Sequence, residues 1–445
     1  TTMDFLKQIA LPQSESQLGV LHLVMNVIYT LLLPFISYLF GALVLSLYHN
    51  RRGRITGNVH AVQYSRDMIE YIIPNKSILL LFGVVPFMAL TFAYAQLLQQ
   101  TPAISVSMMS WGLILFAAAA AFASSYHSAM KLGGMMESVS SGNSDVETLK
   151  SEMSETRRTS GKYALIFLSL SVISLFSATS LAANPQDWSV VTNIMQMIFT
   201  MDVHVKLIQF VFLSLTVASV GTLFFTFGWQ GGKKDINSEY AEYVKTSALP
   251  TALITLLVQP IFVVLSLVAL PVSALSGLVF LSAFLVIFFI FLASHFVYGM
   301  IKGMTPGHAG NAFFMMMLAL IFIVIHTNAS FSNSTKTQSA LLAHNYTLYH
   351  EELMKMMGIS GAALTGEDIF NAKCTACHEF GAKKVGPAYK DVLPKYENDR
   401  TKLLSFVMNP QKMNPAFPPM PNQGLKPAEA DSIAAYIMMM YKKGK

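Results

Sequence analysis

The chain has 445 residues and a formal net charge of +6, with 53% hydrophobic and only 12% charged residues. A soluble globular protein carries about 25% charged residues, so this composition excludes a cytosolic enzyme and indicates an integral membrane protein. The basic residues lie mainly in loops and in the C-terminal region, and we expect no nucleic-acid partner. The two cysteines share one short motif, which excludes a disulfide framework.

The residues Thr1–Gly19 show no cleavable signal pattern, and we expect them to lead directly into the first span. Apolar runs between polar breaks then predict eight spanning helices. Each run has about 20 residues or more, which at ~1.5 Å per residue is enough to cross a ~30 Å hydrocarbon core. The predicted helices are residues 18–48, 77–99, 103–127, 163–183, 204–229, 247–270, 273–300 and 309–327.

The basic residues of the short loops predict the orientation of the chain. Lys and Arg are enriched on the cytoplasmic side of a membrane protein. Here they follow the odd-numbered helices, as with Arg51, Arg52 and Arg54 after the first and Lys131 and Lys150 after the third. We therefore expect both termini to be periplasmic, in a multi-pass protein of the bacterial inner (cytoplasmic) membrane.

The character of the sequence changes after the last apolar run. Residues 328–340 are rich in Ser, Thr and Asn, and the sequence from about residue 361 has few long apolar runs. This predicts a membrane domain over 1–327, a tether over 328–360 and a small periplasmic domain over 361–445. The expected fold class is all-α: a polytopic bundle of about eight spans followed by that domain.

The run Cys374-Thr375-Ala376-Cys377-His378 is a C-x-x-C-H motif. In such a motif two thiols form thioethers with haem vinyl groups, and the adjacent histidine binds the iron. A chance occurrence or a thioredoxin-like redox pair would also place two cysteines three positions apart. The flanking sequence favours the haem interpretation and therefore a covalently bound c-type haem.

Residues 361–445 resemble class I cytochrome c. Gly366–Lys373 is similar to the family's N-terminal helix, with Ile369 and Phe370 facing inward, and Ala428–Met440 is similar to its closing helix. The resemblance implies that a Gly-Pro pair packs near the proximal histidine and that a methionine is the sixth ligand. The cofactor-binding residues expected from the motif and the resemblance are Cys374, Cys377, His378, Pro387 and Met420.

The sixth iron ligand is expected to be Met420, within Phe417–Pro421, since Met/His ligation suits an electron-transfer haem. Met413, in the same loop, is the alternative. With both axial positions filled the haem has no site for a substrate, so we expect electron transfer and no catalytic residue. Four lysines are candidates for a basic docking rim or, equally, for an ordinary solvated face: Lys383, Lys384, Lys390 and Lys395.

Histidines are the informative polar residues of the membrane region, because an ionisable group near the hydrocarbon is costly. His22, His204 and His326 lie near the predicted periplasmic helix ends. Two such histidines from different helices could bind a b-type haem iron, and the alternative is that they reach to interfacial water. A quinone is a further candidate cofactor. Its protons could pass to polar residues near the helix ends: Asp67, Glu70, Asp187, Gln196 and Asp202.

Residues 15–300 also resemble subunit I of the cytochrome bd quinol oxidases. Leu21-His22-Leu23 is similar to the family's first haem-ligand segment, and the polar loop 131–161 and the segment 183–188 follow in the same order. The family's second haem histidine would fall on Gln209. The glutamates of its third helix and its Gly-Arg-Gln-Pro-Trp signature are missing, so the resemblance implies a shared fold without oxygen reduction.

These observations predict a membrane-bound electron-transfer subunit. It would pass electrons between the quinone pool, or a membrane partner, and a periplasmic electron-transfer protein through the c-type haem. The alternative is an anchor or assembly subunit of a larger respiratory complex whose only redox centre is that haem. Other subunits of such a complex and the lipid bilayer are the remaining expected partners.

Overall fold

The computed structural model describes residues 5–136, 144–229, 236–357, 365–397 and 399–443. The described residues form helices and no strand, and the chain divides into two compact units, Thr1–Asn345 and Tyr346–Lys445. The all-α fold class is therefore confirmed. The predicted boundary at residue 361 lies outside the described residues, and the predicted tether contains the end of α12 and the whole of α13 (Lys336–Met356).

Eight helices of the first unit are long and apolar enough to cross a membrane, as the sequence predicts. Two of the spans include a π-helical turn, Leu80–Val84 between α4 and α5 and Phe224–Gly228 after α9. The spans are α2 (Glu15–Thr56), α4 (Lys76–Leu79) with α5 (Val85–Leu97), α6 (Ser105–Met136), α7 (Ser144–Ala182), α9 (Met201–Leu223), α10 (Ser238–Ala269), α11 (Gly277–Ile301) and α12 (Ala309–Ser334).

Shorter helices join these spans. They are α1 (Phe5–Gln8), α3 (Val59–Ile72) and α8 (Ile194–Ile198), with 3₁₀ turns at Pro185–Asp187, Val272–Ala274 and Pro306–His308. Because the number of spans is even, the start of α2 and the end of α12 lie at the same end of the bundle.

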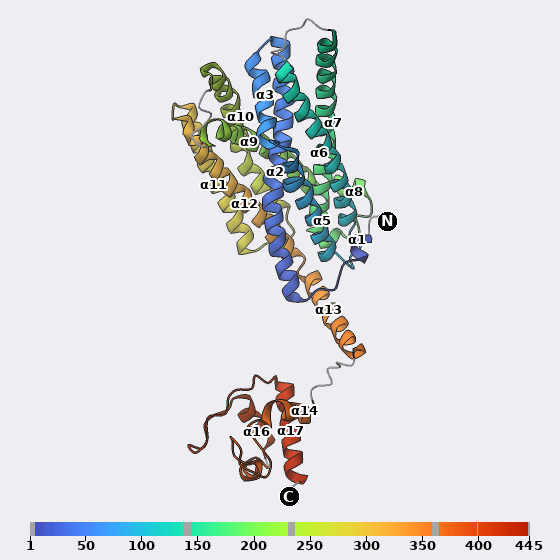
Figure 1. The fold of residues 1–445 in the computed structure, drawn as a ribbon, viewed down its shortest axis with the longest axis vertical. Coiled ribbons are helices and arrows are strands. Elements are labelled where there is room, and N and C mark those ends of the chain that lie inside the picture. The colour runs from blue at the N-terminus through green and yellow to red at the C-terminus, as the bar shows by residue number, and fades with distance from the viewer. Residues whose placement is uncertain (1–4, 137–143, 230–235, 358–364, 398, 444–445) are drawn as a thin grey trace. The chain divides into compact units, whose positions relative to one another are not determined.

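The helix α2 is the central element of the membrane unit. It packs on α3, α5, α9 and α12, and Figure 1 shows α11 and α12 on one side of it and α6 and α7 on the other. A capping box between Ser14 and Gln17 begins the helix, and Gly57, with φ +69°, ends it. At ~1.5 Å per residue its 42 residues are about twice as long as a ~30 Å hydrocarbon core. The helix therefore continues beyond the membrane toward its basic end.

Small residues allow α2 and α9 to approach closely. A Cβ atom added to Gly41 would lie 2.6 Å from the carbonyl carbon of Ser214 and 2.8 Å from the Cβ of Ala218. Such close backbone contact is the usual way in which membrane helices associate, because apolar burial gives no advantage over lipid.

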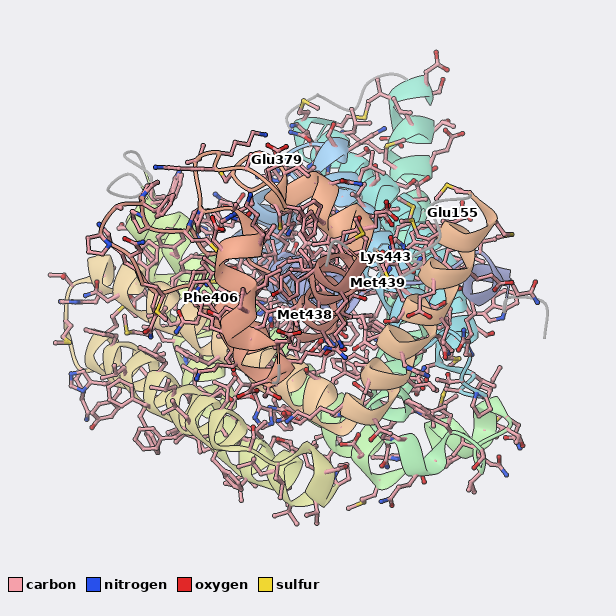
Figure 2. The ribbon with its side chains drawn as sticks, turned by 90° about the horizontal axis from the view of Figure 1, so that it is seen from below. Glu155, Glu379, Phe406, Met438, Met439 and Lys443 are labelled. Atoms are coloured by element: carbon pink, nitrogen blue, oxygen red, sulfur yellow. The ribbon has the colours of Figure 1, made fainter. Side chains whose placement is uncertain are left out.

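The second unit contains a small helical domain. Its elements are α14 (Gly366–Ile369) with the π turn Phe370–Cys374, α15 (Tyr389–Val392) with the 3₁₀ turn Leu393–Tyr396, α16 (Arg400–Met408) and α17 (Pro427–Lys443). Its core lies around α17, which packs on α14 and α16. Met438 of α17 belongs to this core, and the partly buried Phe406 of α16 packs against it; both side chains are labelled in Figure 2. Ile369 and Phe370 are buried, with 1% and 6% of their surface exposed.

Gly366 allows α14 and α17 to cross without a gap. A Cβ at this position would contact the Cβ of Tyr436 and lie 2.9 Å from the carbonyl carbon of Ser432. We expect Gly366→Ala to destabilise this domain by about 1–3 kcal/mol, the usual cost of overpacking. Urea unfolding measures the change, with Gly381→Ala as control because a Cβ at Gly381 meets nothing within 4 Å. Equal stability of the two variants would contradict a tight crossing.

Candidate functional site

The C-x-x-C-H motif forms one helical turn at the end of the first helix of the small domain. The amide of Cys377 donates to the carbonyl of Cys374 at 3.1 Å, and the amide of His378 donates to the same oxygen at 2.9 Å. This turn places both sulfur atoms and the imidazole along one cavity wall. The chain thus presents two thiols and one imidazole to the same space.

That space is a cavity of about 420 Å³. It lies within the range of ~300–1,000 Å³ that is usual for ligand pockets. Its lining is mainly apolar, from Val385, Val392, Leu393, Leu403, Phe406, Val407, Ile433 and Ile437, and Met413 and Met420 line it from the loop before α17. An apolar wall excludes water from a bound cofactor and leaves few polar groups to compete for it.

Pro387 holds the imidazole of His378 in one orientation. The Nδ1 atom of His378 lies 3.1 Å from the carbonyl oxygen of Pro387, so Nδ1–H donates to that carbonyl and Nε2 keeps a free lone pair. A metal-binding histidine usually has such a second partner, which fixes its tautomer and ring orientation. The contact expected for Pro387 is therefore made by its backbone oxygen.

Gly386 packs directly against the imidazole of His378. Its amide donates to the carbonyl of Cys377 at 2.7 Å. A Cβ at Gly386 would lie 2.7 Å from Nδ1 and 2.8 Å from Nε2 of His378. A residue without a side chain is needed here, since any other would displace the imidazole.

Tyr389 completes the surroundings of the motif, and sequence reasoning missed it. Its ring stacks on His378 with centroids 5.0 Å apart and an interplanar angle of 24°, and its side chain hydrogen-bonds Cys374. Burial raises the pKa of the free Cys374 thiol to about 11 and also raises the pKa of Tyr389. The only sequence signal was its place two residues after Pro387.

The two candidate methionines differ in exposure. Met413 has 63% of its surface exposed, whereas Met420 is half-buried, and both line the cavity. The loop around Met420 is fixed by hydrogen bonds from Asn422 to the carbonyl of Met408 at 3.2 Å and from Lys373 to that of Gln423 at 3.2 Å. The less exposed sulfur suits a ligand that must stay in place.

The four lysines of the candidate docking rim are all exposed. Lys384 donates to the carbonyl of Thr375 at 2.6 Å, and the ammonium of Lys383 lies 4.8 Å from the ring centroid of Phe417. Lys395 lines the cavity. These positions suit either a docking rim or a solvated face.

The three histidines considered as haem ligands have separate surroundings. The ring of His22 packs near that of Phe331, with the two centroids 5.8 Å apart. Nδ1 of His204 lies 2.8 Å from the carbonyl oxygen of Thr200. His326 donates from Nδ1 to the carbonyl of Val279 at 3.1 Å. Of the three, His326 lines a cavity within this unit.

The polar residues considered for proton transfer are mostly paired. Four of them have side-chain partners: Asp67 with Tyr240 at 2.7 Å, Glu70 with His127 at 2.5 Å, Asp187 with Asn184 at 2.7 Å and Asp202 with Lys206 at 2.6 Å. Burial alone would raise the pKa of Glu70, but hydrogen bonds from His127 and Lys131 outweigh it and lower the pKa. Gln196 accepts from the amide of Thr192 at 3.1 Å. These contacts suit structural roles at helix ends.

The residues of the small domain fit a covalently bound haem. The cavity brings together two thiols, a histidine with Nε2 available and a thioether donor, and Gly386 leaves room for the imidazole. This donor set is that of a Met/His cytochrome.

Comparison with known proteins identifies this domain. Residues 363–440 match the cytochrome c family. Cytochrome c-552 of Hydrogenobacter thermophilus is 35% identical over 91 residues, which are 19% of this chain and 92% of that protein. Cytochrome c-551 of Pseudomonas denitrificans is 38% identical over 80 residues, covering 17% of this chain and 98% of that protein. Cytochrome c-551 of Azotobacter vinelandii is 32% identical over 78 residues, with coverages of 17% and 95%.

These matches cover less than a fifth of the chain. They do not show the resemblance of the membrane region to the cytochrome bd oxidases, which stays a prediction. For the C-terminal region the identity and the haem geometry agree with each other. Through this domain, which implies a covalently bound haem c and haem-based electron transfer, the chain belongs to the cytochrome c family.

Proposed function

We propose that this protein is a membrane-bound electron-transfer subunit. It passes electrons between the quinone pool, or a membrane partner, and a periplasmic electron-transfer protein through its c-type haem. The observation that carries the proposal is the cavity in which Cys374, Cys377, His378 and Met420 meet. The haem supplies a reversible one-electron couple when it is bound.

The residues of the chain determine what this site does. The two cysteines would attach the haem, and His378 and Met420 would bind its iron, which would leave no site for oxygen or another substrate. Pro387 keeps His378 oriented through its carbonyl, and the apolar wall limits rearrangement of water when the charge of the site changes. Such a site favours electron transfer over bond-making chemistry.

The membrane unit holds the cytochrome domain at a bilayer. Its eight spans and the distribution of basic loops support periplasmic termini in a bacterial inner membrane. An anchor alone would need one span, so we infer that the other helices bind partner subunits of a respiratory complex or a second redox group.

The surroundings of the histidines favour the alternative in which the c-type haem is the only redox centre. His22, His204 and His326 each have a different neighbour. Ligation of a b-type haem by two of them would require side chains to turn toward a common space. In this alternative the membrane unit is an anchor or assembly subunit of a larger complex.

A pyridine haemochrome spectrum of the purified protein tests the function. We expect one covalent c-type haem per chain, retained after extraction with acidified acetone. Absence of covalent haem would overturn the proposal. Removable b-type haem in addition would support an electron path through the membrane, whereas covalent haem alone would support the anchor alternative.

A further inference from the structure

A second cavity lies within the membrane unit, at the end of the bundle where α9 begins and α10 and α12 finish. Its volume is about 90 Å³, and its wall is largely apolar, with contributions from Phe176, Phe210, Val286 and Phe331. Its polar lining residues are Tyr29, Tyr94, Thr179, Lys206, Gln209, Ser266, His326, Thr327 and Ser330. This concentration of polar groups is unusual inside a membrane bundle, where each one is costly unless it has a partner.

Two of these groups lack a complete set of partners. Ser330 has 3% of its surface exposed, and its Oγ has no hydrogen-bond partner among the described residues. His326 donates from Nδ1 to the carbonyl of Val279 at 3.1 Å. Its Nε2 is therefore a lone-pair acceptor at the cavity wall. A buried hydroxyl without a partner is unfavourable, and a polar occupant of the cavity would supply that partner.

Lys206, which lines the cavity, forms an ion pair with Asp202. Nζ of Lys206 lies 2.6 Å from Oδ2 of Asp202 and donates to Oγ of Ser180 at 2.9 Å. Oδ1 of Asp202 is buried and has no partner among the described side chains. Elsewhere in the lining, the hydroxyl of Tyr29 hydrogen-bonds Tyr94 and Thr179.

The volume decides which occupant fits. A cavity of about 90 Å³ has room for about three water molecules at ~30 Å³ each. It is smaller than the ~150 Å³ that accommodates a benzene ring in an engineered cavity, and a substituted quinone ring is larger still. Water is also the small molecule that can both donate to Nε2 of His326 and accept from Ser330.

We propose that this cavity is a water-filled proton-exchange site. Water donates a hydrogen bond to Nε2 of His326, and a hydronium ion can transfer its proton there, leaving water and an imidazolium. The charged or titratable groups around His326 are Lys206 and Asp202 from α9, Tyr29 from α2 and Tyr94 from α5. The lysine and the aspartate are paired with each other, whereas Nε2 of His326 is available to accept a proton.

A cavity that contains water should admit a small hydrated cation. The reaction of such a cation with a cysteine in the cavity wall therefore tests for water. The probe is the silver ion in chloride-free buffer, applied to Ser330→Cys in the haem-loaded full-length protein in lipid nanodiscs. Silver blocks each thiol that it reaches. After denaturation, the thiols that are still free are labelled with a maleimide and counted. Attached haem consumes both native cysteines, and wild-type protein run in parallel reports any thiol that remains there.

Two variants serve as matched controls. Ser37→Cys lies in α2, where Ser37 is 0% exposed and does not line the cavity, and Phe199→Cys lies on the surface, where Phe199 is 72% exposed. We expect silver to react with Ser330→Cys at least about tenfold faster than with Ser37→Cys, because a cation stripped of water is disfavoured in apolar packing. A rate as slow as that of Ser37→Cys would overturn the proposal. Thr327→Cys is the second probe position if Ser330→Cys does not fold.

The proton step has its own test. An imidazolium at His326 repels silver, so the rate at Ser330→Cys should fall as the pH is lowered from about 8 to about 4.5, relative to the double variant Ser330→Cys with His326→Gln. Changes in thiol ionisation cancel in this ratio. An unchanged ratio would show that His326 does not take up a proton, and it would leave the function of the cytochrome domain untouched.

Discussion

Replacement of Met420 by alanine is expected to open the haem iron to carbon monoxide and to lower the haem potential, while the covalent attachment remains. The thioether raises the potential of a His-ligated haem, and without it the sixth position is vacant or filled by water. A carbon monoxide difference spectrum of the reduced protein and a redox titration measure the two effects. Wild-type protein is expected to bind no carbon monoxide.

Met413→Ala is the matched control for this experiment. Met413 lines the same cavity but has 63% of its surface exposed. We expect its replacement to leave both the spectrum and the potential unchanged. The opposite pattern, with carbon monoxide binding only to Met413→Ala, would assign the sixth ligand to Met413.

The second large effect is expected at Gly386. A Cβ there would lie 2.7 Å from Nδ1 of His378 and 2.8 Å from Nε2, closer than packed atoms allow. Gly386→Ala should therefore displace the imidazole, weaken its hydrogen bond to Pro387 and destabilise the domain by about 1–3 kcal/mol. For a domain of this size each kcal/mol lowers the thermal midpoint by about 4–8 °C.

Thermal unfolding followed by the haem absorbance measures this change. Gly381→Ala is again the control, because a Cβ at that loop position meets nothing within 4 Å, and its effect should stay within about 0.5 kcal/mol. If Gly386→Ala is as stable as Gly381→Ala and keeps the wild-type spectrum, the imidazole is not held in the way described.

The surroundings of His378 show how a haem motif depends on residues beyond the motif itself. Cys374, Cys377 and His378 would supply the bonds to the haem, but the orientation of the imidazole depends on the carbonyl of Pro387 and on the stacked ring of Tyr389. Both partners come after the motif in the sequence, beyond a loop that returns to it. The amide of Gly386 in this loop donates a hydrogen bond to the carbonyl of Cys377. The loop therefore joins attachment and ligation in one rigid unit.

Local features of the sequence were sufficient for the architecture. The length and hydropathy of the apolar runs predicted eight spans, because a segment that crosses a bilayer must satisfy its own backbone hydrogen bonds as a helix. The spacing of Cys374, Cys377 and His378 predicted the haem site for an equally local reason, since one helical turn places all three side chains. Helix ends were less accurate: α2 runs to Thr56, beyond the predicted residue 48.

Contacts between distant segments required the tertiary structure. Which histidines share a space depends on how each helix is rotated about its axis, and a hydropathy pattern inside a membrane barely constrains that rotation. The cavity at His326 is lined by residues of seven helices: α2, α5, α7, α9, α10, α11 and α12. No single segment of the sequence therefore predicts it. The difference in exposure between Met413 and Met420 has the same origin, because it depends on how the loop before α17 closes over the pocket.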